Sequence, residues 1–426
     1  MVQKVFLHIG AMKTGTTYLQ RLMEVNADSL DRAGCLFPVT GGWSSQVMAV
    51  RDVLGQTHDP RVRLRAEGAW QRMTEHMMNY EGSTAILSME FLSFAKPAGV
   101  QRIAASFEGV ELHVILTVRD TAGVIPAQWQ SSVRNGHVTS WPDFVDQVTS
   151  GRAGTGTDGR KIIQRAQNVH RMLQRWLQIV PPERFHVVTV PPSDAPRSLL
   201  WERFASVIGV DPAVCSEPAP RSNTSLGHAS TGLIRLISLE IGHLTVSERR
   251  TIKYQLATKT LSERASLEPH ARTNAALREF AAQKNRRMRK SIRAAGVDVV
   301  GDLKDLPTSI ALHDDDRPDD DVESAHRDDM LDAAQFALPR MRDLVDRRAT
   351  ALRESGLPPD DALERLPQPA PTDSEDPLDV AVKELAGVIR VAIELYVRQL
   401  DANLPVEDAP TGDAHPEDAH PDDIVD

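Results

Sequence analysis

The chain has 426 residues, 41% of them hydrophobic, and a formal net charge of −10 at neutral pH. That length allows one large or two medium-sized domains with a sizeable buried core. The charge is uneven, because residues 311–329 carry −7 and residues 401–426 carry −9, which leaves +6 for the rest. A mildly basic body suits an anionic ligand, and we expect the two acidic segments to lie outside it.

Two features bear on the cellular compartment. The two cysteines, Cys35 and Cys215, are too few for a disulfide framework, which favours a reducing environment. The N-terminus leads directly into a strand pattern rather than a signal peptide, and no apolar run approaches the ~20 residues that a membrane span needs. We therefore expect a cytoplasmic protein without a transmembrane segment.

The first element is a short apolar run, Val5 to Ile9, which predicts a strand. An apolar helical pattern starts at Leu19, and the loop before it reads Gly10-Ala11-Met12-Lys13-Thr14-Gly15-Thr16-Thr17. Glycines in such a turn let backbone N–H groups converge on an anion, Thr16 or Thr17 can cap the helix, and the positive helix end adds to the lysine charge. The pattern predicts a site for a phosphate-like dianion.

The position of the lysine distinguishes two kinds of phosphate loop. A Walker A loop needs lysine directly after its second glycine, but here Thr16 follows Gly15 and Lys13 precedes it. The Lys-Thr-Gly-Thr-Thr run resembles instead the 5′-phosphosulfate loop of bacterial sulfotransferases, which use 3′-phosphoadenosine 5′-phosphosulfate (PAPS). The resemblance implies that residues 10 and 13–17 bind this co-substrate. An ordinary strand-to-helix turn with a chance lysine is the alternative.

The apolar run from Thr84 to Phe91 predicts a buried parallel strand. Carboxyl ends of such strands face the ligand crevice, so Ser88 and Glu90 lie where chemistry can occur. Glu90 is our candidate for a catalytic base, and a helix-capping or salt-bridging acid is the alternative. His8, just before the loop, has a more suitable ordinary pKa, although a histidine in a buried strand is more often a hydrogen-bonded core residue.

A third strand, residues 112–118, ends in Arg119-Asp120. A planar guanidinium at a strand end can grip a phosphate. The segment resembles the second sulfotransferase motif, a strand followed by Arg-Asp-Pro, which implies that Arg119 binds the 3′-phosphate of PAPS. Asp120 is then a cap or a partner of Arg119, whereas in a nucleotide kinase it would be a magnesium ligand.

The second motif departs from the family pattern at two positions. Thr121 replaces the proline, and Ala127 stands where the family has a serine eight residues after the arginine. Ser131 lies one helical turn beyond Ala127 on the same face, so it is our candidate for the missing phosphate ligand.

The next segments predict a loop, a helix and a strand. Residues 150–160 are too rich in glycine for regular structure and form either a surface loop or a lid over the acceptor, with Arg152, Arg160 or Lys161 contacting an anion. A long amphipathic helix is expected from Lys161 to Val180, followed by a strand from Phe185 to Val190. These elements extend the predicted parallel sheet.

A polar loop from residue 220 to 227 resembles the late cofactor loop of bacterial sulfotransferases. The resemblance implies that Arg221, Asn223 and Ser225 lie near the 3′-phosphate. A basic cluster at residues 284–290 is interleaved with no aromatic platform, so we interpret it as a solvated helix face and expect no nucleic-acid partner.

Past residue 306 the composition changes. We expect an acidic linker at 307–329, a helical extension at 330–404 with a Pro-rich break at 357–377, and a disordered acidic tail at 405–426. The helix from Leu378 to Leu400 carries a broad apolar face, which must bury either against the body of the chain or in a homodimer. Histidines in the tail sit beside prolines, and we expect no metal site.

Together these patterns predict an α/β fold of the P-loop-like, three-layer kind, with a central parallel sheet flanked by helices and a C-terminal helical extension. The resemblance covers residues 1–306 and implies transfer of a sulfuryl group from PAPS to a hydroxyl or amine of a small-molecule, carbohydrate or lipid acceptor, without a metal. Lys13 and the loop N–H groups would stabilise the charge that develops on the bridging oxygen. A P-loop kinase and a non-catalytic nucleotide-binding regulator on the same fold are the alternatives.

Overall fold

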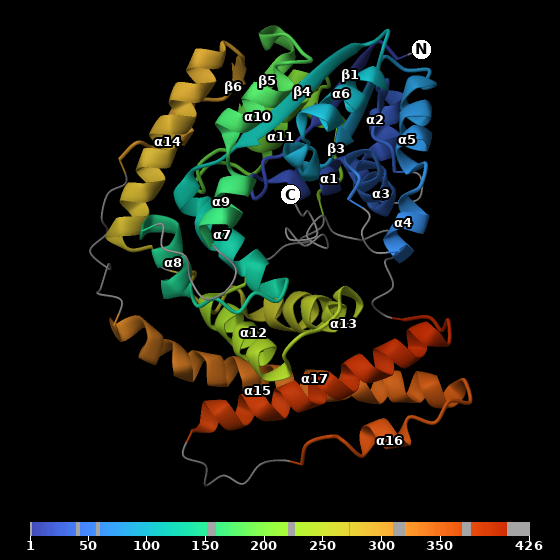
Figure 1. Ribbon diagram of the computed structural model, residues 1–426, viewed down its shortest axis with the longest axis vertical. Coiled ribbons are helices and arrows are strands. Elements are labelled where there is room, and N and C mark those ends of the chain that lie inside the picture. Colours follow the sequence, from blue (N-terminus) through green and yellow to red (C-terminus); the bar gives the residue numbers. More distant parts are fainter. Residues whose placement is uncertain are drawn as a thin grey trace.

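A six-stranded, fully parallel sheet lies at the centre of the computed structural model (Figure 1). The structure describes residues 2–39, 43–56, 60–150, 159–219, 226–271, 273–309, 320–368 and 376–406. The strands, in sheet order, are β2 (Cys35–Leu36), β3 (Thr84–Ser88), β1 (Lys4–His8), β4 (Glu111–Val118), β5 (Phe185–Thr189) and β6 (Asp298–Val300). The expected α/β fold is confirmed.

The three central strands are continuous apolar runs because both of their faces are covered. Leu7 of β1 pairs in register with Leu87 of β3 on one side and Val114 of β4 on the other, and all three are fully buried. The strand expected to reach Phe91 ends earlier, at Ser88. Glu90 instead begins a 3-10 turn, η1 (Glu90–Phe94), whose Ser93 hydroxyl donates a 2.6 Å hydrogen bond to the Glu90 carbonyl.

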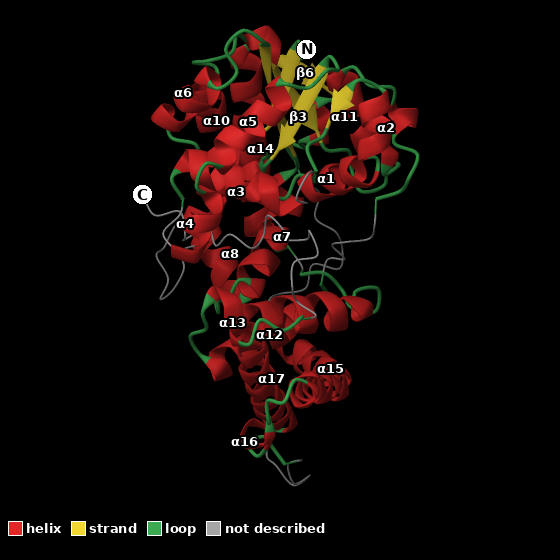
Figure 2. Cartoon of the chain, turned by 90° about the vertical axis from the view of Figure 1, so that its right-hand side faces the viewer, coloured by secondary structure: helices red, strands yellow, loops and turns green. Residues whose placement is uncertain are grey.

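Helices cover the sheet on both faces (Figure 2). On one face lie α3 (Trp43–Leu54), α5 (Ala69–Met78), α6 (Pro97–Ala105), α10 (Val169–Trp176) and α14 (Ala275–Ala295), with α4 (Pro60–Ala66) beside α3. On the other lie α1 (Thr16–Val25), α2 (Ala27–Arg32) and α11 (Ser198–Ile208). Single 3-10 turns occur at η2 (Pro182–Arg184), η3 (Pro212–Val214) and η6 (Leu303–Asp305).

A second apolar core lies away from the sheet and is mostly helical. It is built mainly by α7 (Thr121–Arg134), α8 (Trp141–Ser150), α9 (Gly159–Ala166), α12 (His228–Ile241), the π-helical segment η4 (Thr251–Thr260), the 3-10 turn η5 (Leu261–Arg264) and the C-terminal helices, and α13 (Val246–Arg250) leads into η4. Helix α7 starts at the sheet and contributes Trp129 to this core, so it joins the two parts.

The single helix expected from Lys161 to Val180 is wrong, because the chain forms α9 and α10 with a break between them. The Asn168 side chain accepts a 3.1 Å hydrogen bond from the Arg171 N–H and so caps α10. Asparagine competes for backbone donors in this way and favours helix starts over helix interiors. The preceding Gln167 reaches across to the loop after β1.

The C-terminal helices form a layer beneath α12 and α13 (Figures 1 and 2). Helix α17 (Pro377–Asp401) matches the expected element, and its apolar residues are buried against α15 (Asp320–Glu354) and α12. This packing covers the apolar face within one chain, and the homodimer stays a prediction.

Two boundaries in this region differ from expectation. Helix α15 begins at Asp320, inside the segment expected to be a linker. Arg327, within that segment, pairs with Asp376, and just beyond it Asp332 pairs with Arg264 at 2.7 Å. These ion pairs attach the first part of the helix to the rest of the chain. The Pro-rich break also contains a short helix, α16 (Asp360–Leu363). Residues 310–319 and 407–426, the remaining parts of the acidic segments, lie outside the described residues.

Candidate functional site

The order of the strands identifies where the carboxyl edge of this sheet is expected to bind a ligand. Strand β1 continues through α1 towards β2 and β3 on one side, whereas its other neighbour, β4, continues towards β5 on the opposite side (Figure 1). A point where connections leave in opposite directions is where open α/β sheets bind ligands. The loop from Gly10 to Gly15 follows β1, and Arg119 follows β4, so the topology brings the first two predicted motifs together.

The loop rests on a buried polar network. The Thr117 hydroxyl, from β4, donates to the Gly10 carbonyl at 2.9 Å and contacts the Thr14 hydroxyl, which donates to the Ala11 carbonyl at 2.6 Å. The Gly10 carbonyl also accepts from the Thr117 N–H at 2.6 Å. Both threonine side chains are fully buried. This network holds the loop in place, because moving the loop away from β4 would leave these buried hydroxyl and carbonyl groups without hydrogen-bond partners.

His8 completes this network below the loop. Its Nδ1 lies 2.7 Å from the Ser88 hydroxyl and its Nε2 lies 3.2 Å from the Thr117 hydroxyl. Since the Thr117 proton goes to the Gly10 carbonyl, Nε2 is the nitrogen that carries the imidazole proton, and Ser88 donates to Nδ1. Complete burial lowers the pKa of His8 to about 3. The imidazole is therefore neutral at physiological pH.

Glu90 lies beside the start of the loop. A Cβ placed on Gly10 would stand 3.1 Å from the Glu90 Cβ, and Gly10 has a φ of 107°, so only glycine fits this approach without strain. Gln20 of α1 donates to the Ser88 carbonyl at 3.2 Å and to Glu90 Oε2 at 3.4 Å. The Glu90 side chain is 4% exposed. The structure thus places Glu90, His8 and the loop next to one another.

The helix after the loop is capped differently from our prediction. Helix α1 begins at Thr16, and its N-cap is Gly15, with a φ of 85° and no side-chain cap hydrogen bond. Thr16 and Thr17 are therefore the first helical residues, and the prediction that one of them caps the helix is wrong. Gly15 takes the cap because the loop needs a left-handed residue there. The first N–H groups of α1 are consequently not bound by a cap side chain.

Two side chains hold the outer part of the loop through its carbonyl groups. Gln167, between α9 and α10, donates to the Met12 carbonyl at 2.6 Å. Arg119 Nη1 lies 3.5 Å from the Lys13 carbonyl, at the limit of a hydrogen bond. Lys13 itself has a left-handed φ of 61°. Sequence patterns did not identify Gln167, since nothing in its local sequence relates it to a loop 155 residues away.

Arg119 occupies the junction between the two motifs. A Cβ placed on Gly123, in the first turn of α7, would stand 3.1 Å from Arg119 Nη2, so glycine makes room for the guanidinium. Burial lowers the pKa of Arg119, and the neighbouring Asp120 carboxylate acts in the opposite direction. An arginine stays charged after a shift of this kind, so the site retains a half-buried cation.

Asp120 is a helix cap, which confirms one of the two interpretations of its role. Its Oδ1 accepts from the Ala122 N–H at 3.2 Å at the N-terminus of α7, and from Asn285 Nδ2 at 2.6 Å. Asn285 Oδ1 accepts in turn from the Thr121 N–H and hydroxyl. This buried amide of α14 was not predicted, because the sequence places it in a basic cluster that we interpreted as a solvated face.

The other predicted phosphate ligands are less close or are not described. Ser131 is buried in α7. It lies eight residues beyond Gly123, about 12 Å along the helix axis, so it is not adjacent to the Arg119 guanidinium. Arg221, Asn223 and Ser225 lie outside the described residues, as does Arg152.

No protein-family model, characterised protein or solved structure matches this chain. Within the described ranges, no helix combines the length and the apolar character that crossing a bilayer requires. The same ranges contain no cluster of three or more His, Cys, Asp or Glu side chains arranged to hold a metal ion. The assignment of function therefore depends on the chemistry of the site itself.

Proposed function

We propose that this chain is a PAPS-dependent sulfotransferase. The observation that carries the proposal is that the Arg119 guanidinium lies beside the backbone of Lys13, next to the start of α1 at Thr16, which no side chain caps, at the switch point of the sheet. PAPS is an anion at two ends, with a phosphosulfate on the 5′ side and a phosphate on the 3′ side. Two basic centres on adjacent strand ends suit such a molecule.

The kinase alternative is less well supported. A kinase of this architecture needs an acidic side chain that is available to magnesium after a buried strand. Asp120 is the acid in that position, and its Oδ1 already caps α7 and accepts from Asn285. Binding of magnesium at this oxygen would compete with both hydrogen bonds.

In the proposed reaction an acceptor hydroxyl or amine attacks the sulfur of PAPS. A bond forms between sulfur and the acceptor atom while the bond from sulfur to the bridging phosphate oxygen breaks. The bridging oxygen keeps the electron pair and leaves as part of adenosine 3′,5′-bisphosphate, stabilised by Lys13 and the N–H groups at the start of α1. Glu90 accepts the proton of the acceptor.

Calorimetric titration with adenosine 3′,5′-bisphosphate tests the proposal. Wild-type protein is expected to bind it without magnesium, and Lys13→Ala and Arg119→Ala are each expected to weaken binding by about 10- to 100-fold, the value of a charge-assisted hydrogen bond. Matched controls are Lys4→Ala and Arg184→Ala at the opposite edge of the same sheet. Lys4 and Arg184 pair with the half-exposed Glu111 at 3.7 and 3.9 Å, and ion pairs at the surface contribute little.

Each other result points to a different function. Binding of ATP only with magnesium would favour the kinase. Binding of the bisphosphate without turnover on any of a panel of acceptors would favour the non-catalytic regulator. For an active enzyme, Glu90→Gln should keep bisphosphate affinity and lose most turnover, and unchanged turnover would remove Glu90 from the mechanism.

A further inference from the structure

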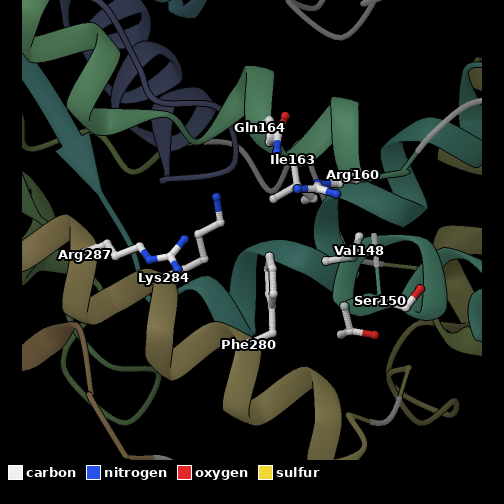
Figure 3. Close-up of a pocket in the computed structure, with 9 residues that line it drawn as sticks. Val148, Ser150, Arg160, Ile163, Gln164, Phe280, Lys284 and Arg287 are labelled. Carbon is white, nitrogen blue, oxygen red and sulfur yellow. The ribbon is translucent and has the colours of Figure 1, made fainter. Parts of the chain in front are cut away.

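A second basic site lies outside the loop, in a surface pocket between α8, α9 and α14 (Figure 3). The cavity measures about 150 Å³, similar to an engineered protein cavity that holds benzene. Three cations from two helices line it, namely Arg160, Lys284 and Arg287. Figure 3 shows their nitrogen atoms directed towards a common space, with the Phe280 ring beside it.

The cations of the pocket repel one another. Burial lowers the pKa of Lys284, and the charges of Arg287 and Arg160 lower it further. Among the residues that the structure describes, the charged groups that shift the pKa of Lys284 are both cations, whereas several arginines elsewhere pair with an acid. Lys284 Nζ instead lies 5.7 Å from the centre of the Phe280 ring. A bound anion would offset this repulsion at Lys284.

The walls of the pocket also bear polar and apolar groups. Gln164 offers a hydrogen-bonding side chain, whereas the Ser150 hydroxyl already donates to the Asp146 carbonyl at 2.6 Å. Ile163 and Phe280 provide apolar surface. This combination suits a phosphate or sulfate group attached to a small carbon skeleton better than a free inorganic ion.

Two of the helices that line the pocket, α9 and α14, adjoin or carry residues that hold the loop site. Helix α9 ends next to Gln167, which holds the Met12 carbonyl, and Arg165 stacks over Phe94 of η1 at 5.1 Å. On α14, the residue after Lys284 is Asn285, which holds Asp120 beside Arg119. A ligand seated in the pocket is therefore next to the elements that shape the proposed co-substrate site.

We propose that this pocket binds a phosphate or sulfate group carried by the acceptor, so that the acceptor is itself an anion. The acceptor role rests on the proposed sulfotransferase function, whereas anion binding by the pocket does not. An anion in the pocket would give Lys284 and Arg287, which the sequence pattern places on a solvated helix face, a common ligand.

The test uses the full chain with Lys13→Ala, which weakens the loop site. Titration with phenyl phosphate, inorganic phosphate and phenol, followed by calorimetry, compares this background with the same chain carrying Lys284→Gln and Arg287→Gln. We expect binding of both phosphates, tighter for phenyl phosphate, no binding of phenol, and a loss of at least about tenfold in affinity when the two cations are removed. The matched control is Lys290→Gln, an exposed cation of α14 outside the pocket.

The outcomes separate the two proposals. If Lys13→Ala abolishes phosphate binding, and Lys284→Gln and Arg287→Gln leave it unchanged, the anion binds in the loop and the pocket proposal is overturned. Bisphosphate binding by the wild type would then still support the sulfotransferase. If the pocket variants lose phenyl phosphate but wild type fails to bind the bisphosphate, the pocket binds anions and the acceptor role is overturned. In an active enzyme, Lys284→Gln should raise KM for a phosphorylated acceptor and leave kcat and the KM for PAPS near their wild-type values.

Discussion

The buried imidazole of His8 predicts a specific loss of stability in mild acid. In the folded chain its pKa is about 3, whereas in the unfolded chain it returns to about 6.5. Below pH 6.5 the unfolded state binds a proton that the folded state does not, so the free energy of unfolding falls as the pH falls from 6.5 towards 3. Above pH 6.5 the contribution is fully present.

The size of the effect follows from the two pKa values. Between pH 7 and pH 5 the unfolded histidine changes from mostly neutral to mostly protonated, and the folded one stays neutral. The linkage relation then gives a loss of about 2 kcal/mol in the free energy of unfolding from this one residue. The loss reaches this size because burial disfavours the imidazolium, and Ser88 and Thr117 already occupy both ring nitrogens.

Urea unfolding at pH 7 and pH 5 measures this contribution as a difference between variants. His8→Gln removes the titrating group, so its stability should fall by about 2 kcal/mol less than that of the wild type over this interval. His170→Gln, at an exposed histidine of α10, is the matched control and should lose as much as the wild type. Equal losses in wild type and His8→Gln would refute the reasoning, because they would mean that His8 takes up its proton without unfolding.

Three further predictions concern the supports of the loop. Thr117→Val removes the hydroxyl that serves the Gly10 carbonyl and His8, and should destabilise the chain by about 2–3 kcal/mol in urea unfolding, whereas Thr117→Ser should stay within about 1 kcal/mol of wild type. Gly10→Ala places a Cβ 3.1 Å from the Glu90 Cβ at a residue with positive φ, and should weaken bisphosphate binding at least about tenfold in calorimetry. Unchanged affinity would contradict the close approach of Gly10 and Glu90. Asn285→Leu leaves Asp120 and the Thr121 N–H without their buried partner, and should cost about 3 kcal/mol in urea unfolding; a cost below about 1 kcal/mol would show that the amide does not position the second motif.

The fold could be predicted from the sequence because its signals are local. Apolar runs predicted the central strands, and α17 occupies nearly the residues that periodicity assigned to it. Positions where the chain departs from a local pattern were harder. Asn168 interrupts an amphipathic pattern that continues on both sides of it, so its role as a cap became visible only with the break in the helix.

The candidate site could be predicted only in part, for a related reason. The positions of Lys13 and Arg119 follow from the strands that precede them, because all strands of a parallel sheet end at one edge. The side chains that hold the two motifs come from distant parts of the chain: Gln167 reaches Met12 of the loop across 155 residues, and Asn285 reaches Asp120 beside Arg119 across 165. No spacing rule connects such partners before the helices are packed.

The structure distinguishes the two candidate bases by their surroundings rather than by their ordinary pKa values. At neutral pH an unperturbed histidine is the better general base, which favours His8 over Glu90. In this fold, however, His8 lies below the loop, uses both nitrogens in hydrogen bonds to Ser88 and Thr117, and is held neutral by burial with a pKa of about 3. To accept a proton from an acceptor it would have to break one of these bonds and become a buried cation. Glu90, by contrast, becomes neutral rather than charged when it accepts a proton, and it lies beside Gly10 at the first turn after β3, on the edge where the loop and Arg119 meet. The same polar network that fixes the loop thus argues against His8 as the base and leaves Glu90 as the carboxylate to test.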